Sequence, residues 1–134
     1  MAIFKDAAKM KEIFGEIWTD MIRNTSFGKE LKEAGITILF VINDPDLTMY
    51  VDEKGPKFGE EAEKQVPVVT MRMAGDIVHK FWLKKINVPK ALALTQIKAK
   101  GPINKVLKIL PLLKPGHEKY PSYCKKYALP MDVD

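Results

Sequence analysis

The spacing of apolar residues changes near residue 35, and this change is the strongest constraint on the fold. Over residues 4–23 the apolar residues recur every three or four positions, which predicts an amphipathic helix. Residues 27–34 predict a second, shorter helix that stops at Gly35, because glycine takes the left-handed conformation at little cost. Residues 36–42 are instead mostly β-branched or aromatic, as in a buried strand. A chain with both patterns predicts an α+β domain.

Further strands are predicted in the middle of the chain. The run Asn-Asp-Pro-Asp at residues 43–46 is a strong turn signal, so the strand before it is predicted to form an antiparallel hairpin with residues 47–52. Residues 57–65 are polar and poorly periodic, which predicts a loop that could hold one short strand. Strand character resumes over residues 66–73 and again over residues 91–100.

Helices are predicted around these later strands. Asp76 is placed to cap a helix that is apolar on one side and ends at Pro89. The Gly-Pro pair at residues 101–102 predicts a turn into another apolar helix, which Pro111 is expected to close. Residues 114–134 are expected to form a helical tail, with tyrosines and a cysteine at helical spacing.

Length and composition indicate one domain. The chain has 134 residues, so residues 1–134 are expected to form a single domain with its own core. No apolar run approaches the roughly 20 residues needed to cross a bilayer, and the N-terminus lacks the regions of a secretory signal. The single cysteine, Cys124, cannot form an intramolecular disulfide. These features favour a soluble, cytoplasmic protein.

Charge is unevenly divided between the two halves of the chain. Residues 1–67 carry 9 Lys+Arg and 13 Asp+Glu, whereas residues 68–134 carry 13 and 4. The basic half is expected to meet an anionic partner: a lipid headgroup, an acyl-CoA phosphate or nucleic acid. Lysines that only solubilise the surface explain the pattern equally well. Because the only arginines are Arg23 and Arg72, specific recognition of nucleic-acid bases is disfavoured. Nucleic-acid binding is therefore a weaker alternative, and it requires tail tyrosines that are exposed and can stack on bases.

No arrangement of residues predicts catalysis, a metal or a cofactor. The serines, Ser26 and Ser122, lie outside any Gly-x-Ser-x-Gly turn. His79 and His117 lack cysteine or carboxylate partners at ligand spacing. Lysines beside Cys124 could lower its pKa, but its place between tyrosines favours packing in the tail. We therefore expect a protein that is not an enzyme and holds no cofactor.

The order of elements between residues 69 and 113 carries a resemblance to a known family. A strand and a helix lead into Ile-Lys-Ala-Lys-Gly at residues 97–101, and that glycine opens an apolar helix. This arrangement resembles the sterol carrier protein type 2 family of nonspecific lipid-transfer domains, and the earlier elements extend the likeness over about residues 1–113. The chain departs from the family where Thr95 replaces a glycine and where it ends without a peroxisomal signal.

The resemblance implies a five-stranded, mainly antiparallel sheet covered by helices, with an apolar tunnel between them. It implies that the tunnel binds an apolar ligand such as a fatty acid, acyl-CoA, sterol or other lipid, without covalent chemistry. Whether the protein transfers or stores this ligand is left open. Methionine suits a cavity that must fit several ligands, although apolar residues of these helices are ordinary core residues in most proteins. The residues expected to line the tunnel are Met71, Met73, Phe81, Trp82, Leu94, Ile97, Ile103, Val106, Leu107 and Leu110.

Lysines near the tunnel mouth are expected to meet an anionic headgroup or an anionic membrane surface. The candidates are Lys98, Lys100, Lys105 and Lys108. The main rival hypothesis is an accessory or dimerisation module that presents apolar substrates to a partner enzyme. The oligomeric state is left open, and a dimer is compatible with either hypothesis.

Overall fold

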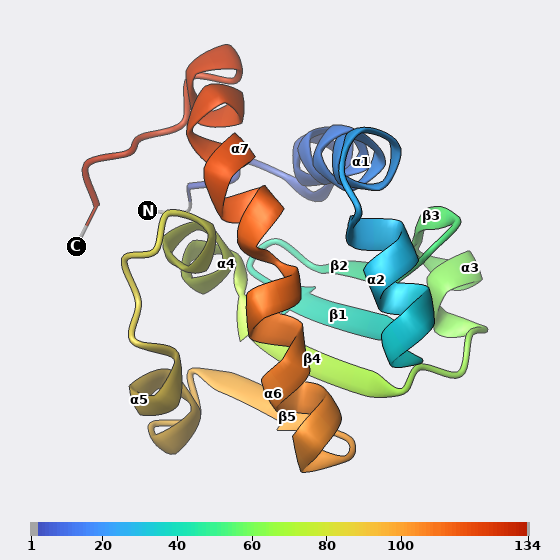
Figure 1. Ribbon diagram of the computed structural model, residues 1–134. Coiled ribbons are helices and arrows are strands. Elements are labelled where there is room, and N and C mark those ends of the chain that lie inside the picture. The colour runs from blue at the N-terminus through green and yellow to red at the C-terminus, as the bar shows by residue number, and fades with distance from the viewer. Residues whose placement is uncertain (1–2, 134) are drawn as a thin grey trace.

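The computed structural model describes residues 3–133, so Met1, Ala2 and Asp134, which are expected to belong to the same domain, lie outside the described residues. Over this range the chain forms seven helices and five strands (Figure 1). The helices are α1 (Ala7–Asn24), α2 (Phe27–Ala34), α3 (Glu60–Glu63), α4 (Gly75–Trp82), α5 (Val88–Ala93), α6 (Ile103–Leu112) and α7 (Lys114–Lys126). The strands are β1 (Ile38–Asn43), β2 (Leu47–Asp52), β3 (Gly55–Phe58), β4 (Val69–Ala74) and β5 (Ile97–Lys100).

The five strands form one sheet in the order β3-β2-β1-β4-β5. Three of the neighbouring pairs are antiparallel, and β1 and β4 are parallel. In the central register Phe40 of β1 lies opposite Met49 of β2 on one side and Met71 of β4 on the other. The prediction of a five-stranded, mainly antiparallel sheet within an α+β fold is therefore confirmed.

Helices cover one face of the sheet (Figure 1). Along β1, Ile38, Phe40 and Ile42 are buried, whereas Leu39 and Val41 on the opposite face are only half-buried. This alternation follows from the two-residue period of a strand. The core between sheet and helices centres on the fully buried Trp18 of α1. The inner face of the sheet is therefore the place where an apolar site can form.

Helix α7 makes an unusually close contact with α4. Gly116 at the start of α7 is buried, and a methyl group there would lie 2.3 Å from Cζ3 of Trp82. The Trp82 ring in turn stands edge-on to Trp18, with ring centroids 5.4 Å apart. Only glycine allows this approach, so the tail helix is fitted directly against the aromatic part of the core.

Two segments differ from the sequence prediction in type. Residues 91–100, predicted as one strand, divide into the end of α5 and the strand β5. Asn87 begins α5 by accepting a hydrogen bond from the Lys90 N–H at 3.0 Å, and Pro89, predicted to end a helix, lies in its first turn. The alanines and leucines that follow alternate as in a strand but are strong helix formers. Residues 57–65, predicted as a loop that could hold one short strand, contain the end of strand β3 and also the short helix α3, which was not predicted.

Two helix ends also differ from the prediction. The N-cap of α4 is Ala74, and Asp76 lies in the first helical turn, where its carboxylate accepts a hydrogen bond from the Ile3 N–H at 2.9 Å. Asp76 therefore joins the N-terminal segment to α4 and does not cap the helix. Pro111, predicted to close α6, lies inside this helix, which continues to Leu112. Its missing N–H removes a hydrogen bond only near the helix end, where the loss is small.

Candidate apolar ligand site

Buried side chains of β4 and α4 meet in one part of the core. Met71 and Met73 point to the inner face of β4, and the exposed Arg72 between them points to the outer face. Phe81 and Trp82 come from the last turn of α4 and are 5% and 2% exposed. Their rings contact each other edge-on, with centroids 5.1 Å apart. These side chains form an apolar wall beside the sheet.

The structure buries six of the ten residues predicted to line the tunnel, and all six belong to the same core. These six are Met71, Met73, Phe81, Trp82, Ile97 and Val106. Leu110 is half-buried and packs against this core. The other three lie on the surface, with Leu94 58%, Ile103 72% and Leu107 59% exposed. The structure thus brings seven of the ten together, and the tunnel itself stays a prediction.

Strand β5 marks the point where the cover of the sheet ends. Ile97 lies opposite Met73, and Ala99 lies opposite Met71, so both side chains belong to the inner face. Ile97 is 1% exposed, but Ala99 is exposed. The helices therefore cover the inner face at Ile97 and leave it open at Ala99.

The four lysines predicted near the tunnel mouth have different surroundings. Lys98 and Lys100 are exposed and alternate with Ile97 and Ala99, so they lie on the outer face of β5. Lys105 Nζ donates a hydrogen bond to the Ala34 carbonyl at the end of α2. Lys108 is exposed on α6. Lys108 is therefore the candidate best placed to meet a headgroup on the helical side of the sheet.

A polar atom without a partner lies inside the core. Trp18 is fully buried, and among the described residues its Nε1–H has no hydrogen-bond partner. Its ring stacks on Phe40 with centroids 5.5 Å apart. A buried donor left unsatisfied costs about 1–3 kcal/mol, which a water or a ligand oxygen could offset. The spacing of apolar residues over residues 4–23 predicts only that Trp18 faces the core, because spacing does not reveal an unpaired N–H.

His79, Tyr120 and Cys124 form a second buried polar group. His79 Nε2 lies 2.5 Å from the Pro130 carbonyl, which can only accept, so Nε2 carries the proton and Nδ1 accepts from the Tyr120 hydroxyl at 2.7 Å. Burial lowers the pKa of His79 and raises that of Tyr120. Burial also raises the pKa of the Cys124 thiol to about 11. These neutral groups tie α4 to α7 and the C-terminal segment, and they do not provide a thiolate nucleophile.

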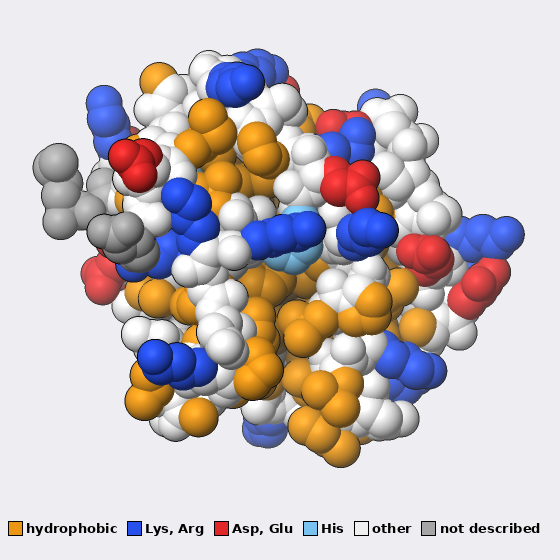
Figure 2. Space-filling view, turned by 60° about the vertical axis from the view of Figure 1, so that its left-hand side comes forward, with side chains coloured by type: hydrophobic (Ala, Val, Ile, Leu, Met, Phe, Trp, Pro, Cys, Tyr) orange, Lys and Arg blue, Asp and Glu red, His pale blue; other side chains and the backbone are white. Residues whose placement is uncertain are grey.

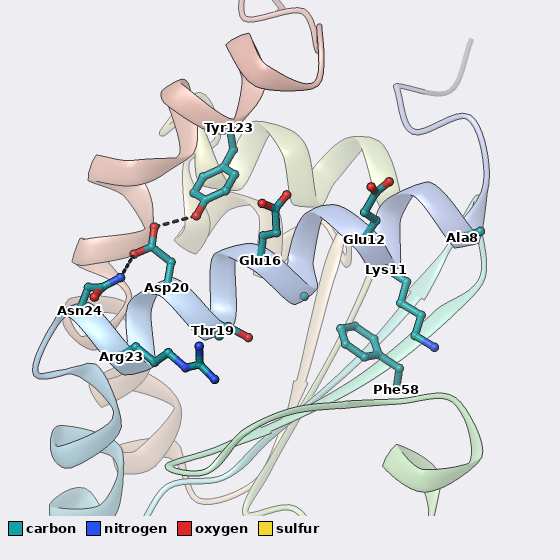
Figure 3. A pocket seen from close by; sticks show the side chains of 11 residues that line it. Ala8, Lys11, Glu12, Glu16, Thr19, Asp20, Arg23, Asn24, Phe58 and Tyr123 are labelled. Carbon is teal, nitrogen blue, oxygen red and sulfur yellow. Dashed lines mark hydrogen bonds between the residues drawn. The ribbon is translucent and has the colours of Figure 1, made fainter.

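A hollow of about 860 Å³ lies on the outer side of α1, beside β3 and α7. Within it, Asp20 accepts hydrogen bonds from Asn24 Nδ2 and from the Tyr123 hydroxyl, both at 2.7 Å (Figure 3). These two bonds, with an ion pair to Lys119 at 3.1 Å, hold the pKa of Asp20 below its ordinary value. The sequence does not predict this hollow, because an amphipathic pattern does not show which elements pack beside the polar side of a helix. Charged side chains of α1 stand around the hollow together with Phe58, and the hydrogen bond of Tyr123 to Asp20 joins α7 to α1 here.

The tyrosines of the tail are not arranged to stack on nucleic-acid bases. Tyr120 is fully buried. The half-buried Tyr123 donates its hydroxyl proton to Asp20, as above, and Tyr127 is half-buried against the core. The aromatic surface on which the nucleic-acid alternative depends is therefore not present in these three residues.

Residues 3–133 contain neither a cluster of metal-binding side chains nor a helix that could span a membrane. No group of three or more His, Cys, Asp or Glu side chains in this range is close enough to hold a metal ion. None of the helices described over the same residues has the length and apolar character needed to cross a bilayer.

The fold defined above is that of a sterol carrier protein type 2-like domain. Sterol carrier protein 2 from Yarrowia lipolytica, in its apo form, superposes with a TM-score of 0.63 at 18% sequence identity and covers 87% of this chain and 98% of its own. The palmitated sterol carrier protein 2-like 2 from Aedes aegypti superposes with a TM-score of 0.56 at 17% identity and covers 78% and 93%. The resemblance inferred from the sequence is thus confirmed at the level of the fold.

A third structural neighbour is a protein of ubiquinone synthesis. The ubiquinone synthesis protein UbiJ-SCP2 superposes with a TM-score of 0.56 at 11% identity and covers 78% of this chain and 92% of its own. Neither a family sequence model nor a curated protein sequence matches the chain.

Proposed function

We propose that this chain binds the alkyl chain of a lipid between the inner face of β4 and β5 and the helices α4 and α6, without changing it chemically. The observation that carries the proposal is the convergence of the buried apolar residues on an inner sheet face that is open at Ala99. The fold supports it further, because one of the neighbours is a palmitated protein. Carriage of the lipid between membranes is the task that we infer for such a site.

Burial of an alkyl chain can provide the binding free energy. Each CH₂ group removed from water contributes about 0.8 kcal/mol, so about ten such groups contribute about 8 kcal/mol before the cost of association. Met71 and Met73 are unbranched and can change rotamers around chains of different shape. The unpaired Nε1–H of Trp18 offers a hydrogen bond to a ligand oxygen.

Helix α6 is the element that we expect to move when the ligand enters. Only Val106 and Ile109 of its ten residues are buried, so few apolar contacts hold it to the core. Pro111 also lies within it. A small displacement of α6 would extend the opening at Ala99 toward the wall formed by Met71 and Phe81.

A pair of substitutions on one strand tests the site. Ala99→Trp fills the open end of the inner face, whereas Lys98→Trp adds the same ring to the outer face. Tryptophan is tolerated in strands, so both variants are expected to fold. In a titration with a fluorescent fatty acid, we expect saturable one-to-one binding by the wild type and by Lys98→Trp. Ala99→Trp is expected to bind at least about tenfold more weakly, because the added ring would remove the burial of about two CH₂ groups of the ligand. Equal binding by the two variants would contradict the proposed site.

The likeness to UbiJ-SCP2 favours one second candidate function, an accessory domain that presents an apolar substrate to a partner enzyme. A quinone with an isoprenoid tail is the substrate class to compare. Competition between a short-chain ubiquinone and palmitate for the same site distinguishes the two functions. Displacement of the fluorescent fatty acid by the quinone at much lower concentration than by palmitate would favour the accessory function.

A further inference from the structure

Large apolar side chains are exposed on two elements that flank β5. Four such side chains are exposed among residues 3–133, and three of them are Leu94 at the end of α5 and Ile103 and Leu107 on α6. Ile103 and Leu107 are one helical turn apart, so they lie on the same side of α6. Figure 2 shows apolar side chains gathered on the lower part of the molecule, the level at which α5, β5 and α6 lie in Figure 1. We name Leu94, Ile103 and Leu107 the apolar face.

The charge around the apolar face has one sign. No Asp or Glu occurs in residues 77–117, and nine lysines do. Lys90 on α5 and Lys108 on α6 are exposed. Basic side chains around exposed apolar residues are typical of surfaces that lie on anionic bilayers, where lysines meet headgroups and apolar residues enter the acyl boundary.

We propose that the apolar face is the surface by which this chain docks on an anionic lipid bilayer. A second copy of the chain would bring two such lysine-rich surfaces together, and their repulsion opposes that occupant. The side chains of the apolar face precede and follow β5, the strand that carries Ala99, and two of them lie on α6, the helix proposed to move. The inference rests on the proposed function, because docking here would place the ligand opening against the bilayer.

Vesicle flotation of the purified full chain tests this surface without added fatty acid. The probes are vesicles of phosphatidylcholine alone and vesicles that contain phosphatidylcholine and phosphatidylglycerol in equal amounts. The variants are Leu94→Ser and the double variant Ile103→Ser/Leu107→Ser. The matched control is Val66→Ser, because Val66 is 90% exposed but lies in the segment between α3 and β4, outside the apolar face. Near-ultraviolet circular dichroism checks that each variant is folded.

We expect the wild type and Val66→Ser to float with anionic vesicles and not with neutral ones. Partition of Leu94→Ser should fall about tenfold, and partition of the double variant should fall by about a hundredfold, about tenfold for each apolar side chain lost. Wild-type-like flotation of both variants, or equal flotation with neutral vesicles, would overturn the proposal. So would a dimer of the wild type that the double variant converts to a monomer, since the occupant would then be a second copy. The fatty-acid titration is a separate experiment, so failure of docking and failure of ligand binding are distinguishable.

Discussion

Thr95 is a single residue at which the chain accepts backbone strain. It follows α5 with a φ of 60°, in the left-handed region, although a β-branched side chain disfavours that conformation. The family that the sequence resembles has a glycine at this position, and glycine takes the same conformation without strain. Thr95 therefore holds the turn into β5 in a conformation that its own side chain disfavours.

Replacement of Thr95 by glycine is expected to stabilise the protein by about 1 kcal/mol, the relief of left-handed strain less the entropy that glycine adds to the unfolded chain. Thermal unfolding followed by circular dichroism measures the change as a higher Tm. Thr70→Gly is the control, because Thr70 lies in the extended strand β4, where glycine should destabilise. If the Tm of Thr95→Gly is equal to or lower than that of the wild type, the claim that the backbone at Thr95 is strained is contradicted.

At the scale of elements, the packing of α7 against α4 depends on the absence of a side chain at Gly116. The helix presents its buried face at Gly116, Tyr120 and Cys124, which are spaced by four residues. Tyr120 reaches His79 on α4, and Gly116 lets Trp82 of the same helix approach. One wall of the proposed ligand site is therefore held in place by the tail helix from outside the site.

Gly116→Ala is expected to destabilise the protein by about 1–3 kcal/mol, because the added methyl group overlaps Trp82 and α7 must move away. Chemical denaturation measures the free energy of unfolding. Glu118→Ala is the control, since Glu118 is exposed on the same helix and its loss should change stability by less than about 0.5 kcal/mol. On helix propensity alone Gly116→Ala would stabilise by about 1 kcal/mol, and that result would show that the contact with Trp82 is not tight.

The elements that the sequence predicted correctly are those with one dominant local signal. The helix over residues 27–34 and its stop at Gly35 are found at those positions, and the hairpin around residues 43–46 pairs as expected. Residues 91–100 were misread because alternating Ala and Leu suits both a strand and a helix, and the cap at Asn87 decided the outcome. Local pattern predicts an element well only where no competing pattern is present.

The candidate site was predicted in part, for a similar reason. In β4 the two-residue period of a strand places Met71 and Met73 on the inner face and Arg72 on the outer face. On α6, however, several apolar residues surround the helix, and the sequence does not state which side meets the core. The structure turns Val106 and Ile109 inward and leaves Ile103 and Leu107 in solvent. The position of a helix about its own axis depends on tertiary contacts, such as that of Lys105 with the end of α2.

At the scale of the whole molecule, the sheet separates two surfaces of different character. Its inner face carries the aromatic core and the proposed ligand site, while Arg72, Lys98 and Lys100 lie on its outer face. The basic C-terminal half of the chain supplies both the edge strand β5 and the helices beside it. The proposed ligand site, its proposed opening at Ala99 and the proposed docking surface therefore all involve β5 or the helices next to it in the chain.

The central claim is that an alkyl chain lies against the inner face of β4. The most direct test is an isotope-filtered NMR experiment on a one-to-one mixture of the protein with ¹³C-labelled palmitate. We expect nuclear Overhauser contacts between palmitate methylene protons and the methyl groups of Met71 and Met73, together with a shift of the Trp18 indole N–H resonance. Palmitate that stays free, or that contacts only exposed residues such as Leu107, would contradict the claim.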